Sequence, residues 1–317
     1  MKRVLIAGGS YFIGKAITEK LVNSGYEVTL LNRGNNKVNG VTQLICDRDQ
    51  KEEMQTVLNG KKFDYLVDVS GMNGMQTEII CNSIDATELK KTIFISSSAV
   101  YDVEHLRARF REDDKLKVNK YWGEYGTNKI EAERTFKRFM EQKKIPLTII
   151  RPSYVYGEEN YVQRESFIFE HILTNQPVIL PDTNKKLQFI YAKDLAMIVK
   201  TLLEKETEKT EIYNVGNSEY VTAKEWVLFC AEAMGKRVET VMFDYKKENM
   251  GVREFFPFHD YDNVLNVDKI KTICPEETDF LQGLKNAYQW FLKEREHIVW
   301  KEQVRKNETE ILKLSQL

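Results

Sequence analysis

The sequence of 317 residues predicts an α/β fold, with a doubly wound parallel sheet and a smaller, interleaved C-terminal portion. In the first half of the chain, short apolar runs alternate with amphipathic segments, beginning with the run Val4–Ala7. This alternation is typical of βαβ units and of a parallel sheet covered on both faces by helices. Beyond about residue 157 the segments become shorter and less regular, and no low-complexity linker separates the two halves. The second portion is therefore expected to be interleaved with the first.

The first turn of the chain is rich in glycine. The run Val4–Ala7 leads into it, and an amphipathic pattern then continues to Gly25. A strand, a glycine turn and a helix in this order begin a dinucleotide-binding unit, where N–H groups at the helix N-terminus face the pyrophosphate. Tyr11 stands where the usual three-glycine pattern has its middle glycine, and glycines at this spacing also occur in ordinary turns. We predict a cofactor-binding turn that contains Gly8, Ser10, Tyr11, Phe12, Ile13 and Gly14.

The tip of the second strand indicates which dinucleotide is bound. The strand Glu27–Leu31 is followed by Asn32 and Arg33, with no acidic residue. An acid at this place binds the ribose 2′-hydroxyl of NAD, whereas a nearby arginine accepts the 2′-phosphate of NADP. The sequence therefore favours NADP over NAD, although an exposed arginine in a turn is also common. After the third strand, Val41–Ile45, Asp47 is placed either to bind the adenine amino group or to cap the next helix.

Two further strands end in small residues. Residues 63–71 are expected to form a strand that runs into Ser70 and Gly71, a turn that can pass close to the cofactor. A helix is expected over 76–90. The strand Thr92–Ile95 ends in the hydroxyls of Ser96–Ser98, at the edge of the sheet where ligands bind in open α/β folds, although such serines are also common in loops.

A tyrosine and a lysine share one face of the helix that begins near residue 121. Tyr125 and Lys129 are four residues apart, and the inward face of this helix is expected to contain Ala132, Phe136 and Met140. A lysine ammonium beside a phenol lowers the pKa of the phenol, which makes Tyr125 a candidate general acid/base. The same spacing occurs in two other tyrosine–lysine pairs, Tyr11 with Lys15 and Tyr220 with Lys224. The setting after the serine-rich strand therefore distinguishes the pair.

The rest of the chain supplies one more strand of the main sheet and then mixed elements. The strand Leu147–Ile150 ends at Arg151. Helices are expected over 167–173 and 223–234, strands over 188–192 and 211–216, and an amphipathic tail helix from Glu296. We assign residues 1–152 and 187–216 to a dinucleotide-binding domain, residues 153–186 and 217–295 to a substrate-binding portion, and residues 296–317 to a helical extension.

Composition excludes several classes of partner. The net charge is −1, so neither a general affinity for nucleic acid nor one for an anionic membrane is indicated. No apolar run approaches the roughly 20 residues of a membrane span, and there is no signal-peptide core. The four cysteines and four histidines are scattered without metal-ligand or disulfide spacing, so no metal site is expected. A cytoplasmic protein with a small-molecule substrate is the resulting expectation.

Together these residues resemble the extended short-chain dehydrogenase/reductase family, the NAD(P)-dependent epimerase/dehydratase group with its Rossmann-type domain. The resemblance covers nearly the whole chain. It is carried by the glycine turn, by Ser97 in a Ser-Ser-Ala-Val-Tyr stretch, and by the Tyr125 and Lys129 pair. Further matching landmarks are residues 151–157, 189–196, 214–216, 267–269, 283–284 and 290–291.

The resemblance implies an enzyme with a catalytic trio. Lys129 would bind the nicotinamide ribose and lower the pKa of Tyr125. Tyr125 would move a proton on or off a substrate hydroxyl while hydride passes between the adjacent carbon and the nicotinamide, and Ser97 would hydrogen-bond the same oxygen. Arg151 would belong to the cofactor-binding residues. A sugar or nucleotide-sugar-like substrate and a homodimer are also implied, whereas epimerase, dehydratase and reductase all stay open.

Two departures from the family pattern leave a rival function open. Tyr11 and the stretch 31–34 resemble the atypical branch that includes the chloroplast stem-loop-binding proteins. Tyr154 and Leu187 stand where epimerases commonly place an asparagine and an arginine that hold the sugar nucleotide. The alternative is a non-catalytic dinucleotide-binding regulator or RNA-associated protein. The near-neutral charge and the intact trio favour the enzyme.

Overall fold

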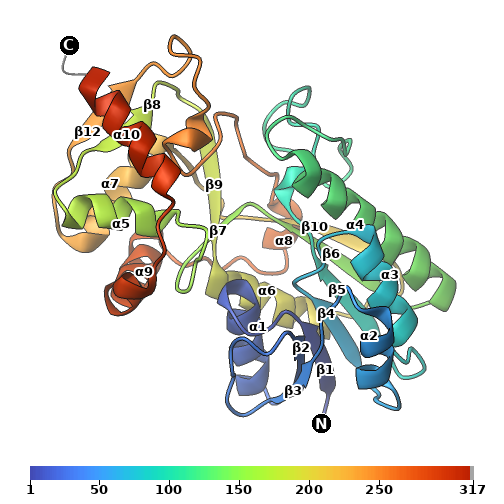
Figure 1. Ribbon diagram of the computed structural model, residues 1–317. Helices are drawn as coiled ribbons and strands as arrows, with labels where there is room; N and C mark the ends of the chain where they lie inside the picture. Colours follow the sequence, from blue (N-terminus) through green and yellow to red (C-terminus); the bar gives the residue numbers. More distant parts are fainter. Residues whose placement is uncertain (315–317) are drawn as a thin grey trace.

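The computed structural model describes residues 1–314 and contains a central parallel sheet. Within the described residues this sheet has seven strands in the order β10-β6-β5-β4-β1-β2-β3, and all its pairs are parallel (Figure 1). The strand order reverses direction next to β1, which creates the crevice where doubly wound folds bind ligands. The strands are β1 (Arg3–Ala7), β2 (Glu27–Asn32), β3 (Thr42–Ile45), β4 (Tyr65–Asp68), β5 (Lys91–Ile95), β6 (Leu147–Pro152) and β10 (Glu211–Val215).

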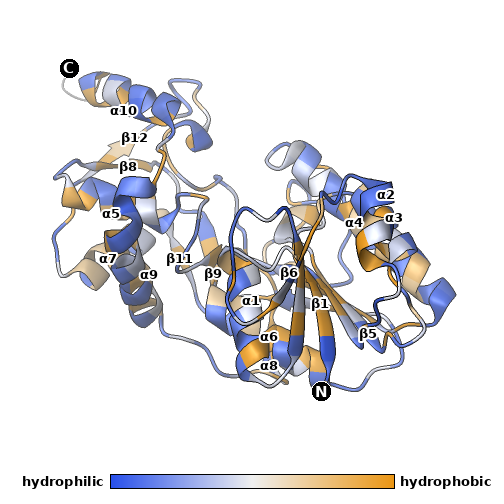
Figure 2. Ribbon diagram, turned by 60° about the horizontal axis from the view of Figure 1, so that its bottom comes forward, coloured by the Kyte–Doolittle hydropathy of each residue, from blue (hydrophilic) through white to orange (hydrophobic). Residues whose placement is uncertain are grey.

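Helices cover both faces of this sheet, as a parallel sheet requires. On one face lie α1 (Phe12–Asn23) and α6 (Ala192–Glu204), and on the other lie α2 (Lys51–Leu58), α3 (Gly74–Ser83) and α4 (Gly123–Lys143) (Figure 1). The predicted inward face of α4 is confirmed, because Ala132, Phe136 and Met140 are fully buried. Figure 2 shows the apolar residues concentrated on the strands and on the helix faces that meet them. The predicted doubly wound fold is confirmed.

A smaller portion is built around an aromatic core. Its first sheet contains β7 (Tyr154–Tyr156), β9 (Lys186–Tyr191) and β11 (Tyr220–Thr222), and its second pairs β8 (Val178–Pro181) with β12 (Thr240–Phe243). The rings of Phe189 and Trp226 stack at 3.7 Å at the centre of this portion. The surrounding elements are α5 (Glu165–Leu173), α7 (Ala223–Met234), α9 (Phe280–Glu294), α10 (Glu302–Leu314), and the 3₁₀ turns η2 (Val252–Glu254) and η3 (Arg295–His297). Two short elements belong to the main portion instead: the 3₁₀ turn η1 (Ser98–Val100) contacts α4, and α8 (Asp268–Lys271) contacts β10.

One predicted helix is shorter than expected. The expected helix over 76–90 is α3, which begins at Gly74, capped by the Asn73 side chain, and ends at Ser83. Ile84 is extended, and the Asp85 side chain then accepts hydrogen bonds from the backbone N–H and hydroxyl of Thr87. This local side-chain turn competes with helix continuation. The prediction for 84–90 is therefore wrong.

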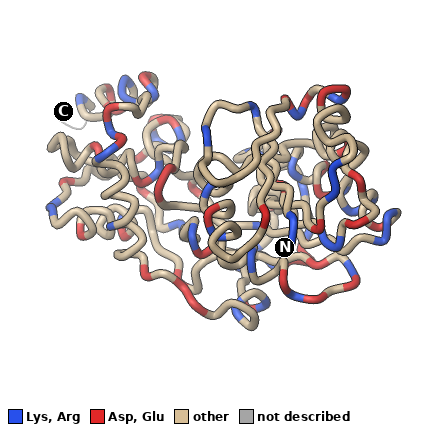
Figure 3. The backbone as a smooth tube through the Cα atoms, turned by 90° about the horizontal axis from the view of Figure 1, so that it is seen from below, with Lys and Arg blue, Asp and Glu red and all other residues tan. Residues whose placement is uncertain are grey.

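The C-terminal helix packs on its own chain. His171 Nε2 on α5 lies 2.8 Å from Glu308 Oε1 on α10, and Asn307 Nδ2 donates to the carbonyl of Glu254 at 2.9 Å. Both side chains contributed by α10 are buried. The last part of the predicted extension, residues 315–317, lies outside the described residues. Figure 3 shows basic and acidic residues interspersed over both portions of the molecule, without a face of one sign in this view.

Candidate active site

A cleft of about 660 Å³ opens at the carboxyl ends of β1 to β4. Almost every residue predicted to bind the cofactor lines it, including the glycine turn, Asn32, Arg33, Asp47 and Ser70. Gly71 and Arg151 do not line the cleft. The other residues that line the cleft are Ala7, Leu31, Asn35, Asn36, Cys46, Arg48, Asp49, Val69, Met72, Gln76 and Tyr161.

The glycine turn is shaped to receive a phosphate group. Gly8 has φ +88°, and a Cβ on Gly14 would come within 2.0 Å of the Gly8 carbonyl oxygen, so both positions require glycine. The helix α1 that follows has no side-chain cap and no acidic residue in its first turn. Its free N–H groups and positive dipole end therefore face the cleft, which fits the pyrophosphate of a dinucleotide.

The side chains at the far end of the cleft fit an adenosine ribose. Asn32 Nδ2 is buried there without a hydrogen-bond partner in residues 1–314, although Asn32 Oδ1 accepts from the Gly34 N–H at 2.8 Å. Arg33 is exposed and forms no ion pair with any described residue. Asp47 Oδ1 accepts from the Asp49 N–H at 3.0 Å, so this carboxylate orders the turn before α2 and could still accept from an adenine amino group. These residues thus leave donors free for a bound nucleotide.

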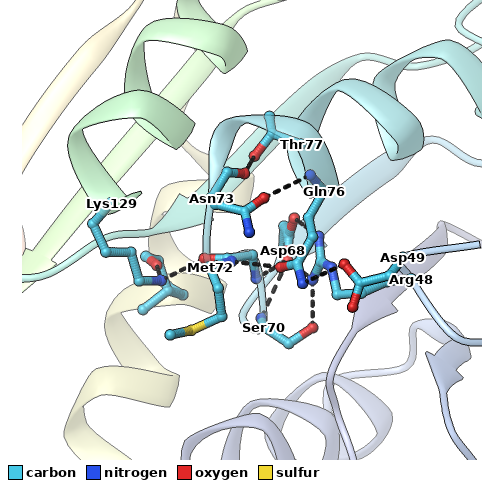
Figure 4. A network of polar contacts seen from close by, with 11 residues as sticks. Arg48, Asp49, Asp68, Ser70, Met72, Asn73, Gln76, Thr77 and Lys129 are labelled. Atoms are coloured by element: carbon cyan, nitrogen blue, oxygen red, sulfur yellow. Dashed lines mark hydrogen bonds and ion pairs between the residues drawn. The ribbon is translucent and has the colours of Figure 1, made fainter. Parts of the chain in front are cut away.

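An ion pair that no sequence motif indicated lies in the wall of the cleft. Asp68 at the end of β4 is fully buried, and both its oxygens accept from the Arg48 guanidinium, at 3.0 and 2.8 Å (Figure 4). Arg48 also donates to Ser70 Oγ at 2.6 Å. The sequence did contain an indication of this pair. Asp68 lies in the apolar strand β4, and a buried aspartate needs a charged or hydrogen-bonding partner.

Ser97 and Tyr125 lie together at the carboxyl end of β5. The Ser97 side chain acts on the Tyr125 phenol, and Ser97 Oγ also accepts from the Ala99 N–H at 3.1 Å. Burial raises the pKa of Tyr125, although Ser97 and the Arg164 charge act in the opposite direction. The sequence-based expectation of a pKa lowered by Lys129 is wrong for the chain alone, because desolvation dominates.

Lys129 points to the sheet. Its ammonium donates to the carbonyls of Gly71 at 2.7 Å and Ile95 at 2.9 Å, and it lies 4.9 Å from the centre of the Phe94 ring. Burial lowers the pKa of Lys129 to about 8. The negative charges of Asp68 and Glu133 act to raise this pKa, and the positive charge of Arg48 acts to lower it. An ammonium has three protons, so one donor is left for a further partner.

Arg151 does not lie at the cleft. Its guanidinium forms a bidentate pair with the buried Glu133, at 2.9 and 2.7 Å, and donates to the Tyr101 hydroxyl and the Glu112 carbonyl. It is 1% exposed. The placement of Arg151 among the cofactor-binding residues is therefore corrected: its donors are used inside the sheet layer.

No sequence motif indicated a group of three interacting cations, Arg164, Arg253 and Lys301, of which Arg164 interacts with Tyr125. Arg164 lies over the Tyr154 ring at 4.9 Å and interacts with Tyr125. Burial and the charge of Arg164 lower the pKa of Arg253. Burial lowers the pKa of Lys301, and the charges of both arginines lower it further. No carboxylate in residues 1–314 forms an ion pair with any of the three. Like charges without a counter-ion favour an anionic ligand.

Neither a metal cluster nor a membrane span was found in the described part of the chain. Residues 1–314 contain no group of three or more His, Cys, Asp or Glu side chains able to hold a metal ion. No helix among them is long and apolar enough to cross a bilayer.

The chain belongs to the NAD dependent epimerase/dehydratase family, whose model matches residues 4–216. Family membership confirms the predicted class of enzyme, an NAD(P)-dependent epimerase/dehydratase of the extended short-chain type. Over 90% of this chain and 78% of that protein, it is 28% identical to the chloroplast stem-loop binding protein of 41 kDa b of Arabidopsis thaliana. It is also 24% identical to a putative UDP-glucose 4-epimerase of Methanocaldococcus jannaschii, over 90% and 97% of the two chains.

Solved structures share the fold at lower identity. UDP-glucose 4-epimerase of Thermotoga maritima, crystallised with UDP-glucose, superposes with a TM-score of 0.77 at 18% identity and covers 92% of this chain and 99% of its own. dTDP-glucose 4,6-dehydratase of Bacillus anthracis, in complex with NAD, gives 0.74 at 19% identity over 93% and 98%. These structures show the fold of more than nine-tenths of the chain.

Proposed function

We propose that this enzyme moves a hydride to or from the hydroxyl or carbonyl carbon of a sugar or nucleotide-sugar-like substrate, with Tyr125 as general acid/base. The observation that carries the proposal is that Ser97 and Tyr125 interact at the same edge of the sheet as the cleft that fits a dinucleotide. Bound NAD(P) would supply the hydride acceptor or donor.

The residues around the reacting oxygen have separate tasks. The Tyr125 phenol is protonated at neutral pH, which is the state needed to protonate a carbonyl oxygen that receives hydride. In the reverse direction a phenolate must take the hydroxyl proton, and Ser97 and the Arg164 charge favour that form. Lys129 would use its remaining donor on the nicotinamide ribose.

NADP is proposed as the preferred cofactor. The support is the exposed, unpaired Arg33 at the tip of β2, where no carboxylate competes for a ribose hydroxyl. Asn32 Nδ2 adds an unused donor in the same place. An anionic group of the substrate would bind near Arg164, Arg253 and Lys301, which together carry the positive charge that is missing at Leu187.

Several broader expectations stay proposals. We propose a cytoplasmic homodimer, built on helices outside the catalytic face as the family resemblance implies. The dinucleotide-binding domain would comprise residues 1–152 and 187–216, the substrate-binding portion residues 153–186 and 217–295, and the helical extension residues 296–317.

The experiment replaces Tyr125 by phenylalanine. Wild-type protein loaded with NADP or NAD is mixed with UDP-glucose, dTDP-glucose and related sugars, and both product formation and the absorbance of reduced nicotinamide are followed. Tyr125→Phe is expected to lower turnover by roughly 10²–10⁴-fold while dinucleotide binding changes little. Tyr220→Phe, an exposed tyrosine with the same lysine spacing, is the matched control. A Tyr125→Phe variant with full turnover would refute the assigned role.

A second candidate is a dinucleotide-binding protein that associates with RNA. The 28% identity to a chloroplast stem-loop binding protein favours it. The net charge of −1 and the interspersed basic and acidic residues along the chain in Figure 3 oppose it, because RNA phosphates require clustered basic residues. Binding of a stem-loop RNA that competes with neither sugar nor dinucleotide, in a protein without turnover, would favour this candidate.

A further inference from the structure

The carboxylate of Asp68 organises the turn that separates the cofactor cleft from Lys129. Besides the Arg48 guanidinium, it accepts from the N–H groups of Ser70 at 3.1 Å and Gly71 at 2.7 Å (Figure 4). A Cβ on Gly71 would come within 2.8 Å of Asp68 Oδ2, so the turn closes tightly on the carboxylate. Asp68 therefore fixes the path of the chain from the end of β4 to α3.

Gly71 connects this carboxylate to the lysine. Its N–H donates to Asp68 and its carbonyl accepts from the Lys129 ammonium at 2.7 Å. Figure 4 shows Lys129 and the Arg48–Asp68 pair on opposite sides of the turn. A shift of Asp68 would thus move one of the two carbonyls that hold the ammonium.

The charges that face Lys129 come from three elements. Asp68 ends β4, Arg48 lies in the loop after β3, and Glu133 lies one turn further along α4. Glu133 is paired with Arg151 at 2.7 Å, so its charge is compensated. Asp68 is compensated in turn by Arg48, whose side chain reaches it from the cofactor cleft.

We propose that Asp68 and Arg48 are positioning residues for Lys129: Asp68 holds the turn that receives the ammonium, and the two side chains act with opposite sign on the charge of that ammonium. The relevance of this charge to turnover rests on the proposed function, in which Lys129 serves as an ammonium. Neither residue touches the reacting atoms.

Removing each member of the pair should act on Lys129 in opposite directions. Asp68→Asn keeps an oxygen for the turn but leaves Arg48 uncompensated, so the ammonium should lose its proton at lower pH. Arg48→Gln leaves the carboxylate uncompensated, so the ammonium should keep its proton to higher pH. Nearby charges typically shift a pKa by one unit or more, so each midpoint should move by about one pH unit.

The experiment titrates Lys129 directly in the full chain. Protein labelled with ¹³C at the lysine Cε is followed by NMR from neutral to alkaline pH, and the Lys129 resonance is identified by its absence in Lys129→Met. Wild type should titrate near pH 8, Asp68→Asn lower and Arg48→Gln higher, whereas Arg48→Lys, which keeps the charge, should stay near wild type. Asp64→Asn is the matched control, because Asp64 precedes the same strand but pairs with Arg3 and Lys90.

Shifts of the same sign in Asp68→Asn and Arg48→Gln, or no shift in either, would overturn the inference, because generally loosened packing would move both midpoints alike. Where turnover is found, the alkaline limb of kcat/KM should follow the NMR midpoint in each variant. Absence of turnover in wild type would contradict the proposed function, while the opposite NMR shifts would still decide this inference.

Discussion

Replacement of Arg151 by methionine should destabilise the protein without impairing dinucleotide binding. The Arg151 and Glu133 side chains are each 1% exposed and joined by two hydrogen bonds. In the variant, Glu133 would keep only the Ser96 hydroxyl, which donates at 2.6 Å, and the distant Lys137 ammonium at 4.0 Å. A buried carboxylate would then lack its main counter-charge.

The expected loss follows from that geometry. Breaking a buried ion pair by removing one partner costs about 3–5 kcal/mol, because an uncompensated charge is left behind. The Tyr101 hydroxyl also loses the Arg151 donor, at 3.0 Å, but it keeps its own bond to Asn214. We therefore expect a decrease of about 4 kcal/mol in the free energy of unfolding.

Urea unfolding followed by circular dichroism measures this decrease, and a fluorescence titration measures NADP(H) affinity in the same samples. Arg134→Met, an exposed arginine next to Glu133 on α4, is the control and should change little. The double variant Arg151→Met with Glu133→Leu should recover part of the loss, since no unpaired charge remains. A stable Arg151→Met variant with dinucleotide affinity reduced tenfold or more would refute the reasoning and restore the sequence-based assignment.

Two further predictions concern the cofactor and the substrate side. Arg33→Ala should weaken NADP(H) binding but leave NAD(H) binding nearly unchanged, as measured by calorimetric titration; equal losses for both dinucleotides would contradict a 2′-phosphate contact. Burial lowers the pKa of His259 to about 4, and the charge of Arg253 contributes to this shift. As the pH falls below about 6.5, His259 therefore becomes protonated in the unfolded chain before it does so in the folded protein. Between pH 7 and pH 4 the wild type should therefore lose up to about 3 kcal/mol more stability than His259→Gln, as urea unfolding at both pH values would show; parallel losses would exclude His259 as the cause.

The sequence predicted the parts of the fold that repeat a local pattern. The strands of the main sheet and the buried face of α4 follow from periodicity, because each needs only apolar residues at a fixed spacing. The end of α3 was not predicted because it depends on the hydrogen bond from the Thr87 N–H to the Asp85 side chain, and hydrophobic periodicity contains no information on such a bond. Local pattern thus predicts where an element exists better than where it ends.

The site residues that belong to a motif within one short segment could be predicted from the sequence. The glycine turn and the serine-rich end of β5 are short stretches with a definite geometry, and the structure brings them to one edge of the sheet. The partners of Asp68 and Arg151 are brought together only by the fold, from 20 and 18 residues away. Arg151 was misassigned because a sequence motif gives its position on a strand but not the face toward which the side chain points.

The loop after β7 contacts the glycine turn and the start of α1. The rings of Tyr11 and Tyr161 lie 5.7 Å apart, Tyr161 meets Phe12 edge to face at 6.1 Å, and Lys15 is paired with Glu159. Tyr11 and Tyr161 also line the cleft, so a dinucleotide held there would lie beside these contacts, and its exchange would be slow if they must part first. Slow exchange would hinder an enzyme that must collect fresh reduced cofactor for each turnover, but it suits one that restores its own cofactor within every catalytic cycle, as an epimerase does.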